Sequence, residues 1–262
     1  MLDTALFTRF EQAIRSFDPL DPKTLDSLLL DHNGRLSIYY APFDYVNLEA
    51  ELVLVGVTPG RTQMYGALEE ARRQLERGAD LEAASIVAKS TASFEGMRQN
   101  LVAMLDYFDV NKLLGINSCH QLFGNASHMM HATSLLRYPV FVDTSNYNGS
   151  PKVTRNKLLR KYVRDYFENE ARQLRNALYI PLGSTVSEAL IWLADEGAIE
   201  NHRVLTGFPH PSGANNERVS YLIGIKPKTE LSHKTDPRKL DDASASIKAK
   251  VAALRSAKAH KA

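Results

Sequence analysis

Apolar residues along this chain come in short runs that alternate with longer amphipathic stretches. The clearest run, Leu52–Val57, is rich in β-branched residues and stops at Pro59 and Gly60. A run of this kind predicts a buried strand that opens into a tight loop. Shorter runs predict three more strands, at His131–Val142, Ala177–Pro181 and His202–Leu205.

Amphipathic stretches with helical spacing lie around and between these strands. In Phe94–Phe108, the apolar residues Met97, Leu101 and Met104 recur on one face of a 3.6-residue period. Further helices are predicted at 64–90, at 154–176, after Gly183, and as two helices within 2–30 that break at Pro19 and Pro22. The segment 36–46 mixes aromatic residues with Pro42 and is predicted to be an irregular or edge segment.

The alternation of strands and helices predicts an α/β fold, with three layers (α/β/α) around a short central parallel four-stranded sheet. Residues 1–225 are predicted to form a single α/β domain with a helical insertion at 64–90. Residues 226–262 are predicted to form a basic C-terminal tail, helical or flexible. In such sheets ligands bind at the carboxyl ends of the strands, where the loops 58–61 and 207–216 are predicted to lie.

Composition narrows the function classes. Cys119 is the only cysteine among 262 residues, which excludes an internal disulfide framework, a four-cysteine iron–sulfur cluster and a four-cysteine zinc site. No apolar run reaches the ~18 residues of a membrane span, and the N-terminus lacks a signal-peptide core. We therefore expect an intracellular (cytoplasmic) protein that has no membrane association and needs no metal or other cofactor.

Charge is unevenly distributed, although the formal net charge is only +2. Lys152–Arg175 holds eight Lys/Arg against three Asp/Glu, and Lys226–Ala262 holds ten against four. Basic regions on an otherwise acidic protein suit a polyanionic partner such as nucleic acid. The alternative, favoured slightly for the tail, is that both are solvated helix faces.

The string Pro209–His210–Pro211–Ser212–Gly213 follows the last predicted strand. The two prolines fix φ on either side of the histidine, so its imidazole is held more firmly than in an ordinary loop. A histidine held in this way can stabilise a developing anion, and Ser212 with the amides beside Gly213 can hold a phosphate. At the other loop, Gly56 and Gly60 leave room for a ligand against bare backbone.

The sequences GVTPG (56–60) and GFPHPSGANNER (207–218) resemble the paired motifs of the uracil-DNA glycosylase superfamily. Between them, Ser93–Gly96 resembles the segment whose phenylalanine stacks on a flipped base. Thr133–Arg137 resembles the second-strand segment whose asparagine reads that base, and Leu182–Thr185 resembles the Gly–Ser turn after the third strand. The resemblance spans about residues 50 to 225.

The resemblance implies a monofunctional DNA glycosylase, which flips a damaged or modified pyrimidine out of DNA and hydrolyses its N-glycosidic bond to leave an abasic site. His210 would donate to the departing base, and Thr58 occupies the position that handles the water. The substrate-binding residues implied are Gly56, Val57, Pro59, Gly60, Phe94, Ser134, Ser212, Gly213 and Asn215. The expected partner is double- or single-stranded DNA, bound by a monomer, in base-excision repair or in defence against phage DNA.

Three departures from the family pattern bear on the substrate. Thr58 stands where many members have Asp or Asn, Ser134 where they have the base-reading asparagine, and Gly60 where the strictest uracil enzymes have tyrosine. The last two predict a roomier pocket that accepts a base other than plain uracil, such as a 5-substituted pyrimidine. A catalytically weak or inactive module that recognises an extruded base is the main alternative. A hydrolase of free nucleosides or small glycosides is a third, against which the basic segments argue.

Overall fold

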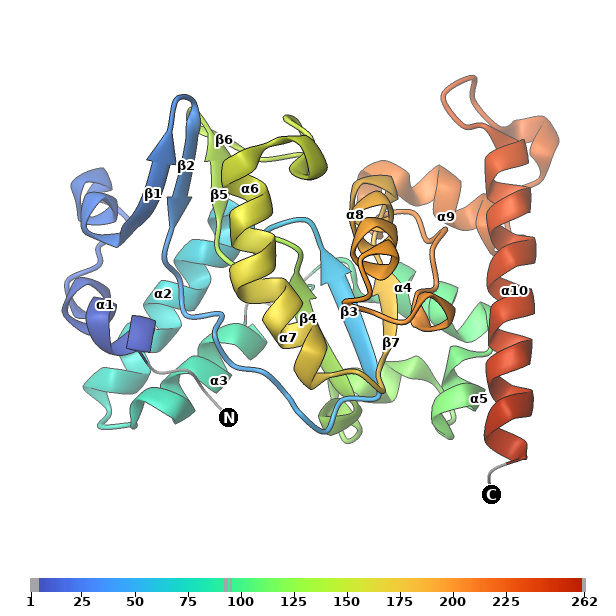
Figure 1. The fold of residues 1–262 in the computed structure, drawn as a ribbon, viewed down its shortest axis with the longest axis horizontal. Helices are drawn as coiled ribbons and strands as arrows, with labels where there is room; N and C mark the ends of the chain where they lie inside the picture. The colour runs from blue at the N-terminus through green and yellow to red at the C-terminus, as the bar shows by residue number, and fades with distance from the viewer. Residues whose placement is uncertain (1–4, 92–93, 95, 261–262) are drawn as a thin grey trace. The chain divides into compact units, whose positions relative to one another are not determined.

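The computed structural model describes residues 5–91, 94 and 96–260 (Figure 1). Contacts within the chain divide it into two compact units, each assembled from three segments. Unit 1 consists of Met1–Leu48, Gly56–Ser93 and Ala132–Leu174, and unit 2 of Glu49–Val55, Phe94–His131 and Arg175–Ala262. The prediction of one domain to residue 225 followed by a tail stays a prediction.

Unit 1 contains an antiparallel sheet with the strand order β1-β2-β5-β6. Its strands are β1 (Leu29–Asn33), β2 (Leu36–Tyr39), β5 (Val140–Val142) and β6 (Ser145–Asn146). In β2, Leu36 and Ile38 are buried while Ser37 and Tyr39 are half-buried, so this strand has the alternation of a sheet with one core face. The segment predicted as irregular therefore begins with a regular strand.

Each helix of unit 1 buries apolar residues, and the charged side chains of Glu70, Lys89 and Glu170 are buried with them. They are α1 (Ala5–Arg15), α2 (Arg61–Glu76), α3 (Leu81–Thr91), α6 (Lys157–Tyr162) and α7 (Asn169–Gln173), with a 3-10 helix at Pro22–Leu28. A π-helical turn, Val163–Glu168, joins α6 to α7. The helices predicted within 64–90 are confirmed as α2 and α3, which pack on each other. The predicted basic helix is confirmed as the run α6 to α7.

The second sheet has the strand order β4-β3-β7 and is parallel. Its strands are β3 (Leu52–Gly56), β4 (Met130–Ser134) and β7 (Leu178–Pro181). In unit 2, β3 pairs with β7 in a register that sets Leu52 opposite Leu178 and Val55 opposite Pro181. All four residues of Leu52–Val55 are buried, as expected for a strand covered on both faces.

This sheet departs from the predicted four strands in two places. The segment 131–142 is divided between β4 and β5, which belong to different sheets, and Pro139 lies in the break because it has no N–H to give to a ladder. The predicted strand at 202–205 forms only an isolated parallel bridge from Val204 to Tyr179, after a 3-10 turn at Asn201–Arg203. The fold is mixed α/β, as predicted, with one parallel and one antiparallel sheet.

Unit 2 is otherwise helical. It contains α4 (Arg98–Tyr107), α5 (Val110–Leu114), α8 (Ser184–Asp195), α9 (Asn216–Leu222) and α10 (Pro237–Ala259). Short 3-10 helices lie at Cys119–Phe123, Ser127–Met129, Gly213–Asn215 and Lys228–Glu230. α10 starts where the Asp236 side chain accepts from the Arg238 N–H, and it packs against α5 and α9 (Figure 1). Over residues 5–91, 94 and 96–260, no helix combines the length and apolar character that crossing a bilayer requires.

Candidate functional site

His210 lies in a loop of unit 2 that follows the β7-paired Val204 and leads to α9. Its side chain is half-buried, and its Nδ1 accepts a hydrogen bond from the Ser212 backbone N–H at 3.3 Å. Burial lowers the pKa of His210 below its ordinary value. The imidazole is therefore neutral near pH 7, and because Nδ1 is an acceptor, the ring proton lies on Nε2. His210 presents a single N–H donor of fixed identity.

The turn after β7 contacts this histidine directly. Gly183 has φ +95°, and a Cβ placed on it would lie 3.7 Å from the His210 Cβ. The Gly183 N–H also donates to the Phe208 carbonyl at 3.0 Å. A residue with a side chain would be strained at this φ, so glycine allows the turn to lie against the histidine loop.

A polar turn follows the histidine and contains three of the expected substrate-binding residues. The Asn215 amide donates to the Ser212 hydroxyl oxygen at 3.1 Å, and the Arg218 guanidinium donates to the Asn215 side-chain oxygen at 2.6 Å. A Cβ on Gly213 would meet nothing within 4 Å. The turn thus offers a hydroxyl, an open stretch of backbone and an exposed cation side by side.

Asn100 of α4 ties down the other side of the histidine loop. Its Nδ2 donates to the Pro211 carbonyl at 2.9 Å and to the Asn216 side-chain oxygen at 2.6 Å. Both partners follow His210 in the chain, so α4 fixes the exit of the loop.

In unit 1, the residues that follow β3 lie beside the end of β4. The carbonyls of Gly56 and Val57 accept the N–H groups of Leu135 and Leu136 at 2.8 and 3.0 Å. A Cβ on Gly56 would lie 3.5 Å from the Ser134 hydroxyl. The structure therefore brings Gly56, Val57 and Ser134 together, as the resemblance implies for residues that line a base pocket.

The Thr58 hydroxyl is committed to the backbone of unit 1. It donates to the Tyr138 carbonyl at 3.0 Å and accepts the Val140 N–H at 3.1 Å. Pro59, the next residue, is buried. Thr58 thus joins the loop after β3 to the start of β5, and its single proton is already used.

Gly60 contacts Asn146 of β6. A Cβ on Gly60 would lie 3.3 Å from the Asn146 Nδ2, and the Asn146 Oδ1 accepts the Arg61 N–H at 3.0 Å. The Arg61 guanidinium in turn stacks over the Phe141 ring, 4.6 Å from its centroid. The space beside Gly60 is thus bordered by a carboxamide.

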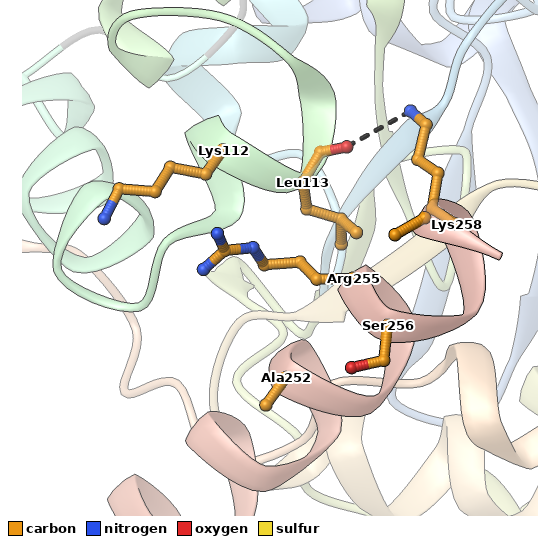
Figure 2. Close-up of a pocket in the computed structure, with 7 residues that line it drawn as sticks. Lys112, Leu113, Ala252, Arg255, Ser256 and Lys258 are labelled. Carbon is orange, nitrogen blue, oxygen red and sulfur yellow. Dashed lines mark hydrogen bonds between the residues drawn. The ribbon is translucent and has the colours of Figure 1, made fainter. Parts of the chain in front are cut away.

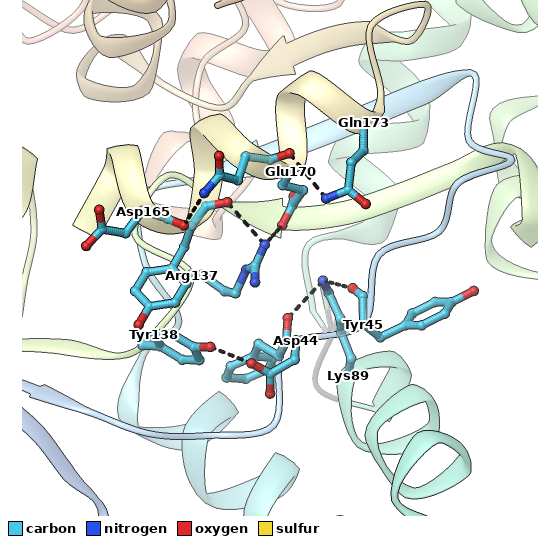
Figure 3. A network of polar contacts seen from close by, with 11 residues as sticks. Asp44, Tyr45, Lys89, Arg137, Tyr138, Asp165, Glu170 and Gln173 are labelled. Atoms are coloured by element: carbon cyan, nitrogen blue, oxygen red, sulfur yellow. Dashed lines mark hydrogen bonds and ion pairs between the residues drawn. The ribbon is translucent and has the colours of Figure 1, made fainter. Parts of the chain in front are cut away.

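Tyr138, whose carbonyl accepts from Thr58, belongs to a network of buried polar contacts (Figure 3). Arg137 pairs with Glu170 at 2.7 Å, and their side chains are only 9% and 1% exposed. The neighbouring Tyr138 donates its hydroxyl to Asp44. Lys89 donates to the carbonyls of Phe43 and Tyr45 at 3.1 and 2.6 Å. Tyr138 therefore links the two: its hydroxyl bonds to Asp44 of the buried network, and its carbonyl accepts from Thr58 in the loop after β3.

Phe94 is the remaining expected substrate-binding residue and belongs to unit 2. It is buried, at 8% exposure, and has φ 54°, an unusual value for a residue with a side chain. Its carbonyl accepts the Met97 N–H at 3.0 Å, just before α4. Ser93 and Glu95, the other residues of the resembling segment beside Gly96, lie outside the described residues.

Comparison with known proteins gives this arrangement a family. The Bacillus subtilis (strain 168) protein YoxB is 38% identical over 209 residues, which cover 78% of this chain and 82% of YoxB. The chain belongs to the YoxB family. The similarity extends over most of both chains and is not limited to a short shared motif. YoxB is described as an uncharacterized protein. No family model and no solved structure matches the chain.

Sequence reasoning missed several polar residues of this YoxB-family chain. Asn100, Asn146 and Arg218 each contact a predicted site residue or its loop. Asn100 and Asn146 do not stand out in the sequence, and Arg218 ends the string 207–218 but was given no role. Arg218 was within reach, because it lies three residues after Asn215, where side chains on one helical face meet. Asn146 was not, since it contacts Gly60 across 86 residues of chain.

Proposed function

We propose that this YoxB-family protein is a monofunctional DNA glycosylase of the uracil-DNA glycosylase superfamily. It flips a damaged or modified pyrimidine out of DNA and hydrolyses the N-glycosidic bond, leaving an abasic site. One observation carries the proposal: the Ser212 N–H bonds to Nδ1 of His210, so a neutral imidazole held between two prolines has its proton on Nε2.

The chemistry needs such a donor. When the glycosidic bond breaks, its electron pair leaves with the base and negative charge develops on the pyrimidine O2. A hydrogen bond from the His210 Nε2–H stabilises that charge. Water then adds to the sugar carbon and loses a proton, and the base anion takes up a proton, so a free base and an abasic sugar result. No metal or other cofactor is needed for this step.

The turn after His210 suits the phosphates of a flipped nucleotide. The Ser212 hydroxyl, the backbone at Gly213 and the Arg218 cation are the groups that bind phosphate without reading sequence. Arg218 is exposed and is held by Asn215 at 2.6 Å, so its charge is oriented before DNA arrives.

Recognition of the base is assigned to the loop after β3 and to Ser134. Serine cannot make the two-point contact of an amide with a uracil edge, and Gly60 has no side chain to exclude a 5-substituent. A 5-substituted pyrimidine is therefore the proposed substrate class. The proposal includes the three-layer fold of the superfamily, action as a monomer, and a location where the protein meets cellular or phage DNA.

A second candidate function is recognition of an extruded base without cleavage. The observation that favours it is the Thr58 hydroxyl, which is already bonded to the Tyr138 carbonyl and the Val140 N–H. A hydroxyl so engaged cannot activate water, and threonine is no base at neutral pH. Cleavage then requires a water that attacks a largely dissociated sugar cation, whereas recognition requires no water.

Mass spectrometry of bases released from duplexes that contain uracil or 5-substituted pyrimidines tests the proposal. We expect release by the wild type and a ~10²–10³-fold slower release by His210→Ala, the usual cost of one oxyanion donor. His202→Ala is the matched control, since that side chain is 62% exposed in the same unit. Salt-dependent DNA binding without release of any base would favour the recognition function. If the protein neither releases a base nor binds DNA, both the glycosylase function and the recognition function are refuted.

A further inference from the structure

The loop that carries His210 is entered through Gly207, and α10 lies directly against that residue. Gly207 has φ +113°, and a Cβ on it would lie 2.8 Å from the Ala243 Cβ and 3.4 Å from the Ile247 Cδ1. Real Cβ atoms do not approach so closely, so backbone and helix meet without a side chain between them. Both positions require small residues: glycine in the loop and alanine in the helix.

The helix is held firmly at this point. Ile247 and Val251, one turn apart, are its buried residues, at 0% and 2% exposure. Lys250 donates to the Val204 carbonyl at 2.9 Å, three residues before Gly207. α10 therefore contacts the segment 204–207 in two ways, by apolar packing against Gly207 and by a charge-assisted hydrogen bond to the Val204 carbonyl.

Both halves of α10 have further anchors in unit 2. Near its start, Asp241 accepts the Tyr221 hydroxyl of α9 at 2.8 Å. Towards its end, residues of α10 and α5 line an open hollow of about 590 Å³, and Arg255 and Lys258 are among them (Figure 2). Arg255 pairs with Asp109 at 3.1 Å and Lys258 donates to the Leu113 carbonyl at 3.2 Å.

Between Gly207 and His210 the chain has little freedom to absorb a displacement. Phe208 is buried, packs edge-on against Phe108 with ring centroids 5.5 Å apart, and accepts the Gly183 N–H. Pro209 then fixes φ immediately before the histidine. A shift at Gly207 is therefore passed to the imidazole.

We propose that α10 is a positioning element for His210, and that Ala243 is its positioning residue through contact with Gly207. The inference rests on the proposed function for the role of His210. It makes 226–260 part of the catalytic unit, where the sequence predicts a basic C-terminal tail, helical or flexible. It also gives the basic side chains Lys250, Arg255 and Lys258 intramolecular roles in holding the helix.

Ala243→Leu tests this, because the added bulk has to displace Gly207. We expect kcat for base release to fall ~10–10²-fold with KM nearly unchanged, since a misplaced catalytic group loses transition-state contacts while substrate binding remains. Ala245→Leu is the matched control, because that alanine is exposed on the same helix. Ala243→Val gives a smaller displacement if the leucine variant does not fold.

A second readout does not depend on activity. Long-range ¹H–¹⁵N spectra of the imidazoles report which ring nitrogen carries the proton, and His210→Gln identifies the signal. We expect Ala243→Leu or Ala243→Val to shift the Nδ1 resonance of His210 and Ala245→Leu to leave it unchanged. If the wild type releases no base, the proposed function fails while this shift still supports positioning. Unchanged His210 signals in a folded Ala243 variant would overturn the inference, as would an unchanged kcat in an active one.

Discussion

The side chain of Asn146 lies directly against Gly60, so that a Cβ on the glycine would be 3.3 Å from the Asn146 Nδ2. The backbone does not explain the glycine, because Gly60 has φ −81°, which any residue can adopt. Space explains it: a larger residue has to move a carboxamide that also accepts the Arg61 N–H.

Gly60→Tyr should therefore do more than fill a pocket. We expect it to displace Asn146, cost about 1 kcal/mol through loss of the bond to Arg61, and abolish release of 5-substituted pyrimidines. Asn146→Ala separates the two effects, because it removes the carboxamide without adding bulk. Release from uracil and 5-substituted duplexes, with urea unfolding of each variant, measures both. Robust wild-type release of uracil alone would contradict the proposed substrate class.

The pH dependence of base release should follow the lowered pKa of His210. Protonation would place a second proton on Nδ1 and break the bond from the Ser212 N–H, so the fixed geometry needs the neutral ring. Because burial lowers the pKa of His210 below 6.5, we expect the rate to fall on the acidic side with a midpoint below pH 6.5. An acidic limb centred above pH 6.5 would argue against this environment for His210.

The extent to which sequence predicted this structure follows from the range of the interactions involved. The strand Leu52–Val55 and the helices within 64–90 are set by local periodicity, and both were predictable. The antiparallel sheet was not, because β2 pairs with β5 across about a hundred residues and β1 begins only at the end of the segment predicted as helical. Local patterns carry no information on such partners.

The same reasoning applies to the candidate site. The histidine loop was visible because its prolines and glycines are adjacent in sequence. The contact of Gly207 with Ala243 was not, although a glycine immediately before a rigid motif is a sign of close approach by another element. The basic composition of 226–262 suggested a tail. Only two side chains of α10, Ile247 and Val251, are buried, so the sequence gives little sign that this helix packs on the protein.

Removing one partner of the buried Arg137–Glu170 pair of unit 1 should lower the free energy of unfolding far more than replacing both partners by apolar residues. Arg137→Met or Glu170→Gln leaves a buried group without its charged partner, and we expect a loss of ~3–5 kcal/mol in urea unfolding. The double variant Arg137→Met/Glu170→Leu should recover much of that loss. The more exposed pair Arg172–Glu168, at 2.6 Å, is the control, and Arg172→Met should cost about 1 kcal/mol or less. Equal losses at both sites would show that burial does not matter here.

Lys89 should make the protein more stable at alkaline pH. Burial lowers its pKa from 10.5 to about 8, although the charge of Glu170 acts in the opposite direction. Between pH 8 and 10.5 the unfolded lysine holds a proton that the folded one has lost, so stability rises with pH in this window. The rise should approach ~3 kcal/mol and be absent in Lys89→Met. Unfolding free energies at pH 7.5, 9 and 10.5 would show it, and parallel curves for the two proteins would contradict it.

Glu217 should make the segment after α9 sensitive to acid. Its carboxylate accepts from Lys226 at 3.0 Å, from the Ser232 N–H and hydroxyl at 3.1 and 2.7 Å, and from the Thr235 hydroxyl at 2.5 Å. The Thr235 and Ser232 hydroxyls, with Lys226, lower its pKa from 4.5 to about 2.

Because the folded pKa lies below the unfolded one, the stabilisation is complete above pH 4.5 and is lost as pH falls towards 2. Glu217→Gln should therefore lower Tm at pH 7, and its gap to the wild type should close through that window. Glu230→Gln, an exposed acid of the same segment, is the control and should change Tm little at any pH. The segment leads into α10, which contacts Gly207. Glu217→Gln should therefore also slow base release at pH 7, because a less firmly held α10 positions Gly207 less well. A gap in Tm that stays constant down to pH 2 would show that the four hydrogen bonds do not depend on the charge of Glu217.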